Sequence, residues 1–120
     1  MIATDHAPHS AEEKSRGLAG SLMGVVGIET AFPLLYTYLV KPGIISLARL
    51  IALMHDIPCR RFGISLPMAE NFTAFDLDQE YAIDPAEFLS KGRATPFEGW
   101  KVNGRCKLTV ADGKLAWVGE

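Results

Sequence analysis

The sequence lacks the features that define several large classes of protein. It has two cysteines, Cys59 and Cys106, and no CxxC pair, so we expect two buried or half-buried thiols rather than a disulfide framework. No apolar run approaches the roughly 20 residues that span a bilayer. Lys and Arg number 12 against 14 Asp and Glu, a net charge of -2. A nucleic-acid partner is not expected, because proteins that hold polyanions are usually basic.

The composition is otherwise that of an ordinary globular protein. Of 120 residues, 48% are hydrophobic and 22% are charged, which argues against a disordered, collagen-like or coiled-coil chain. The length suits one compact domain. The first residues lack the basic start and long apolar run of a signal peptide, so a cytoplasmic location away from membranes is the expectation.

Up to about residue 65 the pattern is apolar and helical. A very short strand is predicted at Ile2–Thr4. Ser10 and Glu13 have the spacing of a capping box, which predicts a short helix ending at Gly17. Residues 17–27 carry four glycines and are predicted to form a loop that a ligand could approach closely.

Two longer helices are predicted next. Apolar residues at helical spacing indicate a helix over residues 28–40. Ser46 is a suitable cap for another, and Pro58 is expected to open a short further turn ended by Gly63. The inward face of the helix after Ser46 is predicted to hold Leu47, Leu50, Ile51 and Met54.

The later region is richer in strand signals. Strands are predicted at residues 72–77 and 81–83, with Asp84 capping a short helix. Asn103-Gly104 and Asp112-Gly113 are both predicted to be hairpin turns. An opening strand with no parallel neighbour in the chain suggests part of a longer protein.

Reactive side chains are densest in the segment Thr4-Asp5-His6-Ala7-Pro8-His9. An acidic residue after a short apolar strand, with imidazoles close behind, suits metal binding or acid-base chemistry. By itself such a segment is more often a capping or surface pair. His55 ends a predicted helix, where the helix dipole favours a cation, and nothing marks it as functional.

Several motifs, in order along nearly the whole chain, resemble the C-terminal part of bacterial dihydroorotase, a family of metal-dependent amidohydrolases. The matching stretches are Thr4-Asp5-His6-Ala7-Pro8-His9, Glu12-Glu13-Lys14, residues 24–35, Phe75-Asp76-Leu77-Asp78, Phe88-Leu89-Ser90-Lys91 and residues 95–100. One six-residue match could arise by chance, whereas an ordered series hardly could.

The resemblance implies an α/β fold, a (β/α)8 TIM barrel with a smaller composite domain. Residues 1–65 would be the C-terminal end of the barrel, with its last strand and helices. Residues 66–120 would be the β-rich C-terminal part of the small domain. The family's other metal ligands, a His-x-His pair, a carboxylated lysine and two later histidines, have no counterpart here. The remainder of the barrel is thus an implied partner.

Asp5 matches the family's metal-coordinating aspartate on the final barrel strand. The resemblance implies that it helps to bind a binuclear Zn²⁺ site and acts as the general acid and base. The implied reaction is the reversible interconversion of dihydroorotate and N-carbamoyl-L-aspartate, a step of pyrimidine biosynthesis. The implied substrate is thus a small molecule.

Three further positions match substrate-binding residues of the family. His9 matches a residue that binds the substrate carboxylate, and Met23 and Gly24 match two whose backbone meets the substrate ring. Met23 departs from the usual phenylalanine, which a backbone contact tolerates. His6 has no matching metal role and is interpreted as structural.

Other interpretations remain open. One is a hydantoinase- or allantoinase-like enzyme. The substrate of such an enzyme would have no free carboxylate for His9 to bind. A non-catalytic scaffold subunit for aspartate transcarbamoylase would tend to lose metal ligands, yet Asp5 is intact. The chain could also be an independent interaction module, and a homodimer is a further candidate assembly. Residues 63–76 depart from the family pattern and look shorter, which leaves the small-domain register open.

Overall fold

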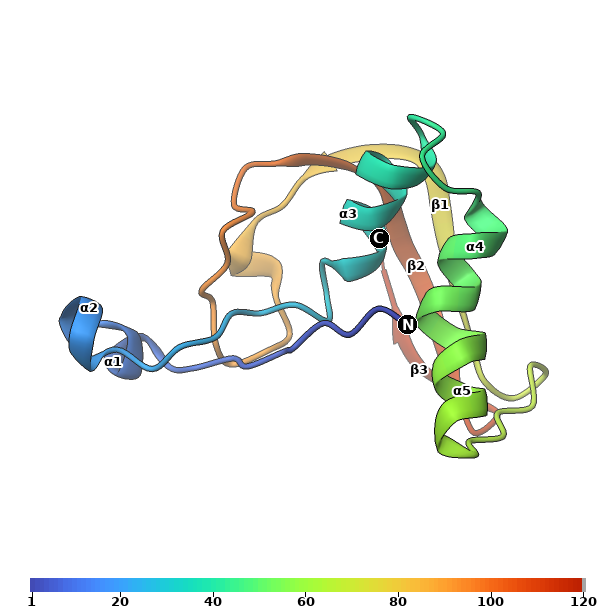
Figure 1. Ribbon diagram of the computed structural model, residues 1–120, viewed down its shortest axis with the longest axis horizontal. Coiled ribbons are helices and arrows are strands. Elements are labelled where there is room, and N and C mark those ends of the chain that lie inside the picture. The colour runs from blue at the N-terminus through green and yellow to red at the C-terminus, as the bar shows by residue number, and fades with distance from the viewer. Residues whose placement is uncertain (120) are drawn as a thin grey trace.

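The computed structural model describes residues 1–119 and contains one three-stranded antiparallel sheet (Figure 1). The strands follow the order β1-β2-β3. Their bounds are β1 (Phe72–Ala82), β2 (Lys101–Ala111) and β3 (Lys114–Val118). The helical segments fall earlier in the chain, apart from the 3-10 turn η3 (Pro85–Glu87). The expected change from helical to β-rich structure is therefore present.

Both long helices predicted from the apolar spacing are present, and each contains a π-helical turn. The first is α3 (Ala31–Leu35) continuing as η1 (Tyr36–Val40). The second runs without a break through α4 (Leu47–Ile51), η2 (Ala52–Asp56) and α5 (Ile57–Phe62). Ser46 caps it by accepting a hydrogen bond from the Arg49 amide, and Gly63 ends it with φ 65.

Pro58 and Ile51 differ from expectation in this second helix. Pro58 does not open a separate turn, because the helix continues through it directly after the wide turn η2. Leu50 is fully buried as predicted, whereas Ile51 is 46% exposed. Ile51 precedes η2, and at 3.6 residues per turn it falls at the opposite edge of the predicted apolar stripe from the fully buried Leu50.

The N-terminal predictions hold in part. The Ser10–Glu13 capping box is present at α1 (Ala11–Lys14). That helix ends before Gly17, because both the amide and the hydroxyl of Ser15 donate to the Glu12 carbonyl. Gly17 instead begins α2 (Gly17–Gly20), so the glycine-rich stretch is not entirely a loop. No strand forms at Ile2–Thr4. Nearby, His6 and Val25 form a single isolated parallel β-bridge.

The prediction of a hairpin turn at Asn103-Gly104 is wrong, since β2 passes straight through both residues. Gly104 has φ 96, and a Cβ there would lie 3.2 Å from a ring carbon of Phe32. Asn103 is buried and bonds to Thr37, Lys41 and Asp78. Asn103 and Gly104 therefore lie where α3 and η1 pack against the sheet.

The rest of the sheet follows the local signals more closely. The two predicted strands at 72–77 and 81–83 are one strand, β1, with an irregularity where the Asp76 carboxylate accepts the Asp78 and Gln79 amides. Asp84 caps η3 as predicted. Asp112 and Gly113 make the β2–β3 turn, with φ 50 and 70.

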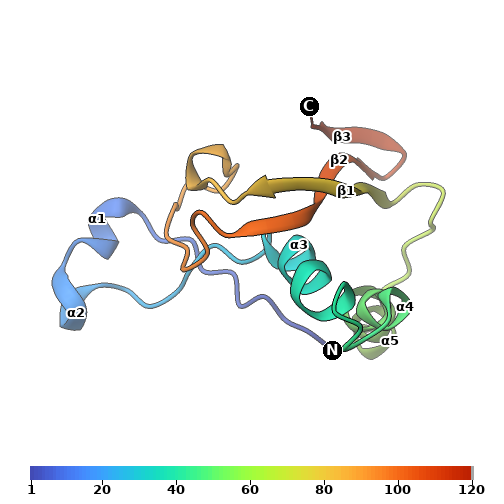
Figure 2. The same cartoon turned by 90° about the horizontal axis from the view of Figure 1, so that it is seen from above.

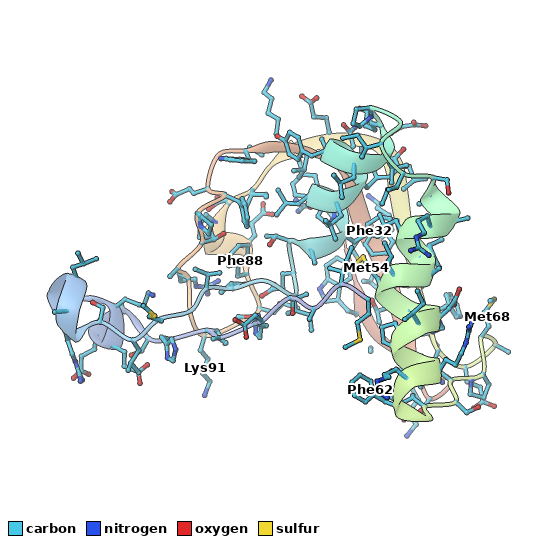
Figure 3. The ribbon with its side chains drawn as sticks, in the orientation of Figure 1. Phe32, Met54, Phe62, Met68, Phe88 and Lys91 are labelled. Atoms are coloured by element: carbon cyan, nitrogen blue, oxygen red, sulfur yellow. The ribbon has the colours of Figure 1, made fainter. Side chains whose placement is uncertain are left out.

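The hydrophobic core is small for a chain of this length. One cluster of buried residues joins the sheet to the loops, and it consists of Val26, Ile83, Phe88 and Val102. The chain exposes 8074 Å², whereas a compact protein of this mass exposes about 6,400 Å². Phe32 and Phe88 point into the body, but Phe62 and Met68 are 64% and 81% exposed (Figure 3). Much apolar surface is thus without a partner within residues 1–119.

Two extended segments carry α1 and α2 away from the sheet and the other helices, as both views agree (Figures 1 and 2). Across residues 1–119 no helix is both long and apolar enough to cross a membrane. Cys59 and Cys106 are half-buried free thiols, as expected.

Candidate functional site

The reactive segment lies beside the glycine-rich segment. A parallel bridge joins His6 to Val25, and the Ala7 amide donates to the Val25 carbonyl at 3.0 Å. Gly24 has φ 127, and a Cβ there would lie 2.4 Å from the Ala7 Cβ. The absence of a side chain at Gly24 therefore allows the close approach of the two segments.

Asp5 is exposed and adopts φ 47, in the left-handed region that non-glycine residues seldom occupy. Within residues 1–119 its carboxylate makes no hydrogen bond or ion pair, so it does not cap the neighbouring backbone. Asp tolerates this backbone conformation better than most residues do. Asp5 is free to bind an external group.

His6 has a structural contact. Its Nδ1 accepts the amide hydrogens of Gly27 at 3.2 Å and Ile28 at 3.3 Å. This arrangement requires an unprotonated Nδ1, so the ring hydrogen is on Nε2. His6 thereby fastens the segment that follows Asp5 to the start of the turn before α3. His55 lies far along the chain and pairs with Asp56 at 2.9 Å.

The structure brings together the three residues that the resemblance implied for substrate binding. His9 Nε2 lies 2.8 Å from the Met23 carbonyl oxygen, and its Cδ2 lies close to Gly24. His9 Nδ1 lies 3.7 Å from a carboxylate oxygen of Glu13. Because Nε2 donates to the Met23 carbonyl, Nδ1 is the ring nitrogen left to face Glu13.

Glu13 is an ionised partner on the far side of His9. The Ser10 amide donates to its carboxylate at 2.8 Å and the Ser10 hydroxyl at 3.0 Å. These bonds hold the pKa of Glu13 below its ordinary value, with smaller contributions from the charges of His9 and Arg16. The ionised Glu13 therefore places a negative charge beside His9 Nδ1.

Within the described residues, the backbone of Met23 and Gly24 is bonded through its carbonyl groups and not through its amides. The carbonyl groups of both residues accept side-chain hydrogen bonds, from His9 and Lys14 respectively. Their two amide N–H groups find no acceptor in the described chain, residues 1–119. Met23 is also 92% exposed. Two adjacent unpaired donors on a fixed segment can bind a polar ring.

Lys14 is a residue of this site that the sequence did not single out. Its ammonium donates to the carbonyl oxygens of Leu22 and Gly24, each at 2.9 Å. The acceptors are backbone groups, which leave no trace in a sequence pattern. Lys14 belongs to a stretch that matches the family, Glu12-Glu13-Lys14, but that match implied no role for it.

Glu29 anchors the site to the small core. Its carboxylate accepts the amides of Leu89 and Ser90 and the Ser90 hydroxyl, the last at 2.6 Å. Burial alone would raise the pKa of Glu29. The hydrogen bonds from the Ser90 hydroxyl and the two amides outweigh that effect, so the pKa lies below its ordinary value.

A zinc centre needs three or four converging ligands. Among residues 1–119, no three His, Cys, Asp or Glu side chains converge in a way that could hold a metal ion. Asp5 can offer one carboxylate and no more. The donor set of this chain therefore does not fit a complete metal site, although the free Asp5 carboxylate suits one ligand of a shared site.

The structural comparison indicates the class of protein. The structure of this chain is similar to that of the L-hydantoinase (dihydropyrimidinase) of Arthrobacter aurescens, with a TM-score of 0.73 and 30% sequence identity. The likeness covers 85% of this chain and 24% of that chain. This likeness and the α/β content fit a piece of an amidohydrolase. No family model matches the sequence.

The sequence narrows the class further. The chain is 51% identical, along its whole length, to a dihydroorotase of Bacillus cereus (strain ATCC 10987 / NRS 248), and 50% identical to one of Bacillus thuringiensis (strain Al Hakam). The chain is thus confirmed as a relative of the dihydroorotases. It spans 29% of the length of each of these two proteins. The aligned stretch of 125 residues exceeds the 120 of this chain, so the chain is locally shorter than these relatives.

Proposed function

We propose that this chain is the C-terminal part of a dihydroorotase, which interconverts dihydroorotate and N-carbamoyl-L-aspartate. The observation that carries the proposal is the identity of about 50% over the whole chain. The unpaired Asp5 carboxylate, the His9 imidazole and the free Met23 and Gly24 amides support it. The rest of the enzyme would supply the remaining catalytic groups.

In this proposal residues 1–65 complete the barrel and residues 66–120 form the β-rich part of the small domain. Helices α1–α5 precede residue 65 and the sheet follows it, in agreement with this division. The small core and the exposed Phe62 and Met68 also suit a chain that packs against more protein. We propose that the remainder of the same dihydroorotase covers this exposed apolar surface.

Asp5 is assigned as one metal ligand and as the proton-transferring group. A Zn²⁺ pair, when bound, would supply a Lewis acid beside the substrate carbonyl. In hydrolysis, the oxygen of water forms a bond to the ring carbonyl carbon, and the ring C–N bond breaks. The Asp5 carboxylate accepts the proton from that water and returns it to the leaving nitrogen.

The other residues would bind and orient the substrate. A protonated His9 would hold the substrate carboxylate through Nδ1, in place of the Glu13 carboxylate 3.7 Å from that atom, because Nε2 is bonded to Met23. The amides of Met23 and Gly24 would donate to polar atoms of the ring. Holding the ring at three points would keep its reacting amide beside Asp5.

A hydantoinase-like activity is the second candidate, since the structural neighbour is named as one. Such substrates carry no free carboxylate, so His9 would have no partner. The two candidates differ in the substrate that the full-length enzyme prefers: dihydroorotate in the first, hydantoin or dihydrouracil in the second. A preference for the second pair would favour the alternative.

The isolated chain should show no dihydroorotase activity. Asp5 alone cannot hold zinc selectively, since the described residues offer no further ligand beside it. The measurement is turnover of dihydroorotate by the purified 120-residue chain with added zinc, against a blank that contains zinc alone. Turnover above that blank would show that the chain builds an active site by itself.

A further inference from the structure

Lys14 lies in a closed network between α1 and the segment of Met23 and Gly24. Its ammonium donates to the carbonyls of Leu22 and Gly24, and its own carbonyl accepts the Ser21 hydroxyl at 2.7 Å. The Leu22 amide donates to the Glu13 carbonyl at 3.2 Å. Both ends of Lys14 are therefore tied to the same stretch of backbone.

The carbonyls of three successive residues are consequently held by side chains. Leu22 and Gly24 are held by Lys14, and Met23 between them is held by His9. Fixing these three carbonyls also fixes the peptide planes between them, because each peptide group is planar. The unpaired amides of Met23 and Gly24 are then held in one orientation.

We infer that Lys14 is a positioning residue for substrate binding, which aims the Met23 and Gly24 amides at the substrate ring. This inference rests on the proposed function. The ammonium is suited to the task because its three donors can bond two carbonyls at once. Bonds from a charged donor are also stronger than those from a neutral one. Lys14 itself need not touch the substrate.

The test is Lys14→Met in the full-length enzyme, since Met keeps much of the apolar stem but has no donor. Loss of both bonds lets the segment move, and a displacement near 1 Å can cost about 10²-fold in rate. We expect kcat/KM for dihydroorotate to fall about 10- to 100-fold, with zinc content unchanged. Lys14→Arg, which can still donate to both carbonyls, should recover most of the loss.

Lys114→Met is the matched control, because Lys114 lies at the exposed β2–β3 hairpin. It should leave kcat/KM as in the unsubstituted enzyme. Amide hydrogen exchange of residues 21–25 gives a readout apart from activity and should be faster in Lys14→Met alone. Wild-type kinetics in Lys14→Met, or equal losses in Met and Arg variants, would overturn the inference. An unsubstituted enzyme without dihydroorotase activity would instead contradict the proposed function, and the inference with it.

Discussion

Replacing Asp5 with Asn in the full-length enzyme should abolish turnover while the fold is kept. The amide has nearly the shape of the carboxylate but cannot accept a proton at neutral pH. Loss of general acid-base catalysis alone costs about 10²- to 10⁴-fold, and a weakened metal site would add to it. Because the Asp5 carboxylate makes no bond within residues 1–119, its loss should not unfold this part of the protein.

Asp112→Asn is a close control for Asp5→Asn. Asp112 is also exposed and also has a positive φ, 50 against 47 for Asp5, but it lies in the β2–β3 turn. Asn tolerates this backbone conformation, so both variants should keep the native structure by circular dichroism. Asp112→Asn should turn over dihydroorotate normally. If Asp5→Asn did the same, the base would lie elsewhere.

Replacing His9 with Ala should weaken the enzyme's action on dihydroorotate in both directions of the reaction. A hydrogen bond to a charged group contributes about 1.5–3 kcal/mol. We therefore expect kcat/KM for dihydroorotate and for carbamoyl-aspartate to fall roughly ten- to a hundredfold or more. Zinc content should not change, because His9 bonds Met23 and faces Glu13 rather than a metal ligand.

Dihydrouracil, which lacks the carboxylate, distinguishes two roles of His9: binding the substrate carboxylate and holding the Met23 carbonyl. If the imidazole serves the carboxylate, wild-type and His9→Ala enzymes should act on dihydrouracil at similar, low rates. Equal losses on both substrates would mean that His9 matters through its bond to the Met23 carbonyl. His55→Ala is the control and should change neither rate, because His55 is exposed within the helix from Leu47 to Phe62 and not at its end as the sequence predicted.

Several local signals in the sequence were accurate where neighbouring residues decide the conformation. The Ser10–Glu13 capping box, the Ser46 cap and the Asp112-Gly113 turn all form, and each depends on residues within a few positions. The Asn103-Gly104 prediction failed because a distant ring, Phe32, packs on Gly104. Tertiary packing there overrides a strong local preference for a turn.

The candidate site likewise combines residues that the sequence could identify with contacts that depend on tertiary structure. The sequence could nominate Asp5 and His9 because their types and spacing match a family motif. The bond from His9 to Met23 joins residues 14 positions apart and depends on how two extended segments lie together. Lys14 escaped notice because it binds backbone carbonyls, which every residue carries.

The most direct test is a chimera in which this chain replaces the matching 29% of the Bacillus cereus dihydroorotase. Identity of 51% along the whole chain makes such an exchange feasible. The measurement is the rate of conversion of dihydroorotate to carbamoyl-aspartate, with and without Asp5→Asn. The account predicts turnover by the zinc-loaded chimera and its loss in the Asp5→Asn form. A folded, zinc-loaded chimera that is inactive, or one whose activity survives Asp5→Asn, would contradict it.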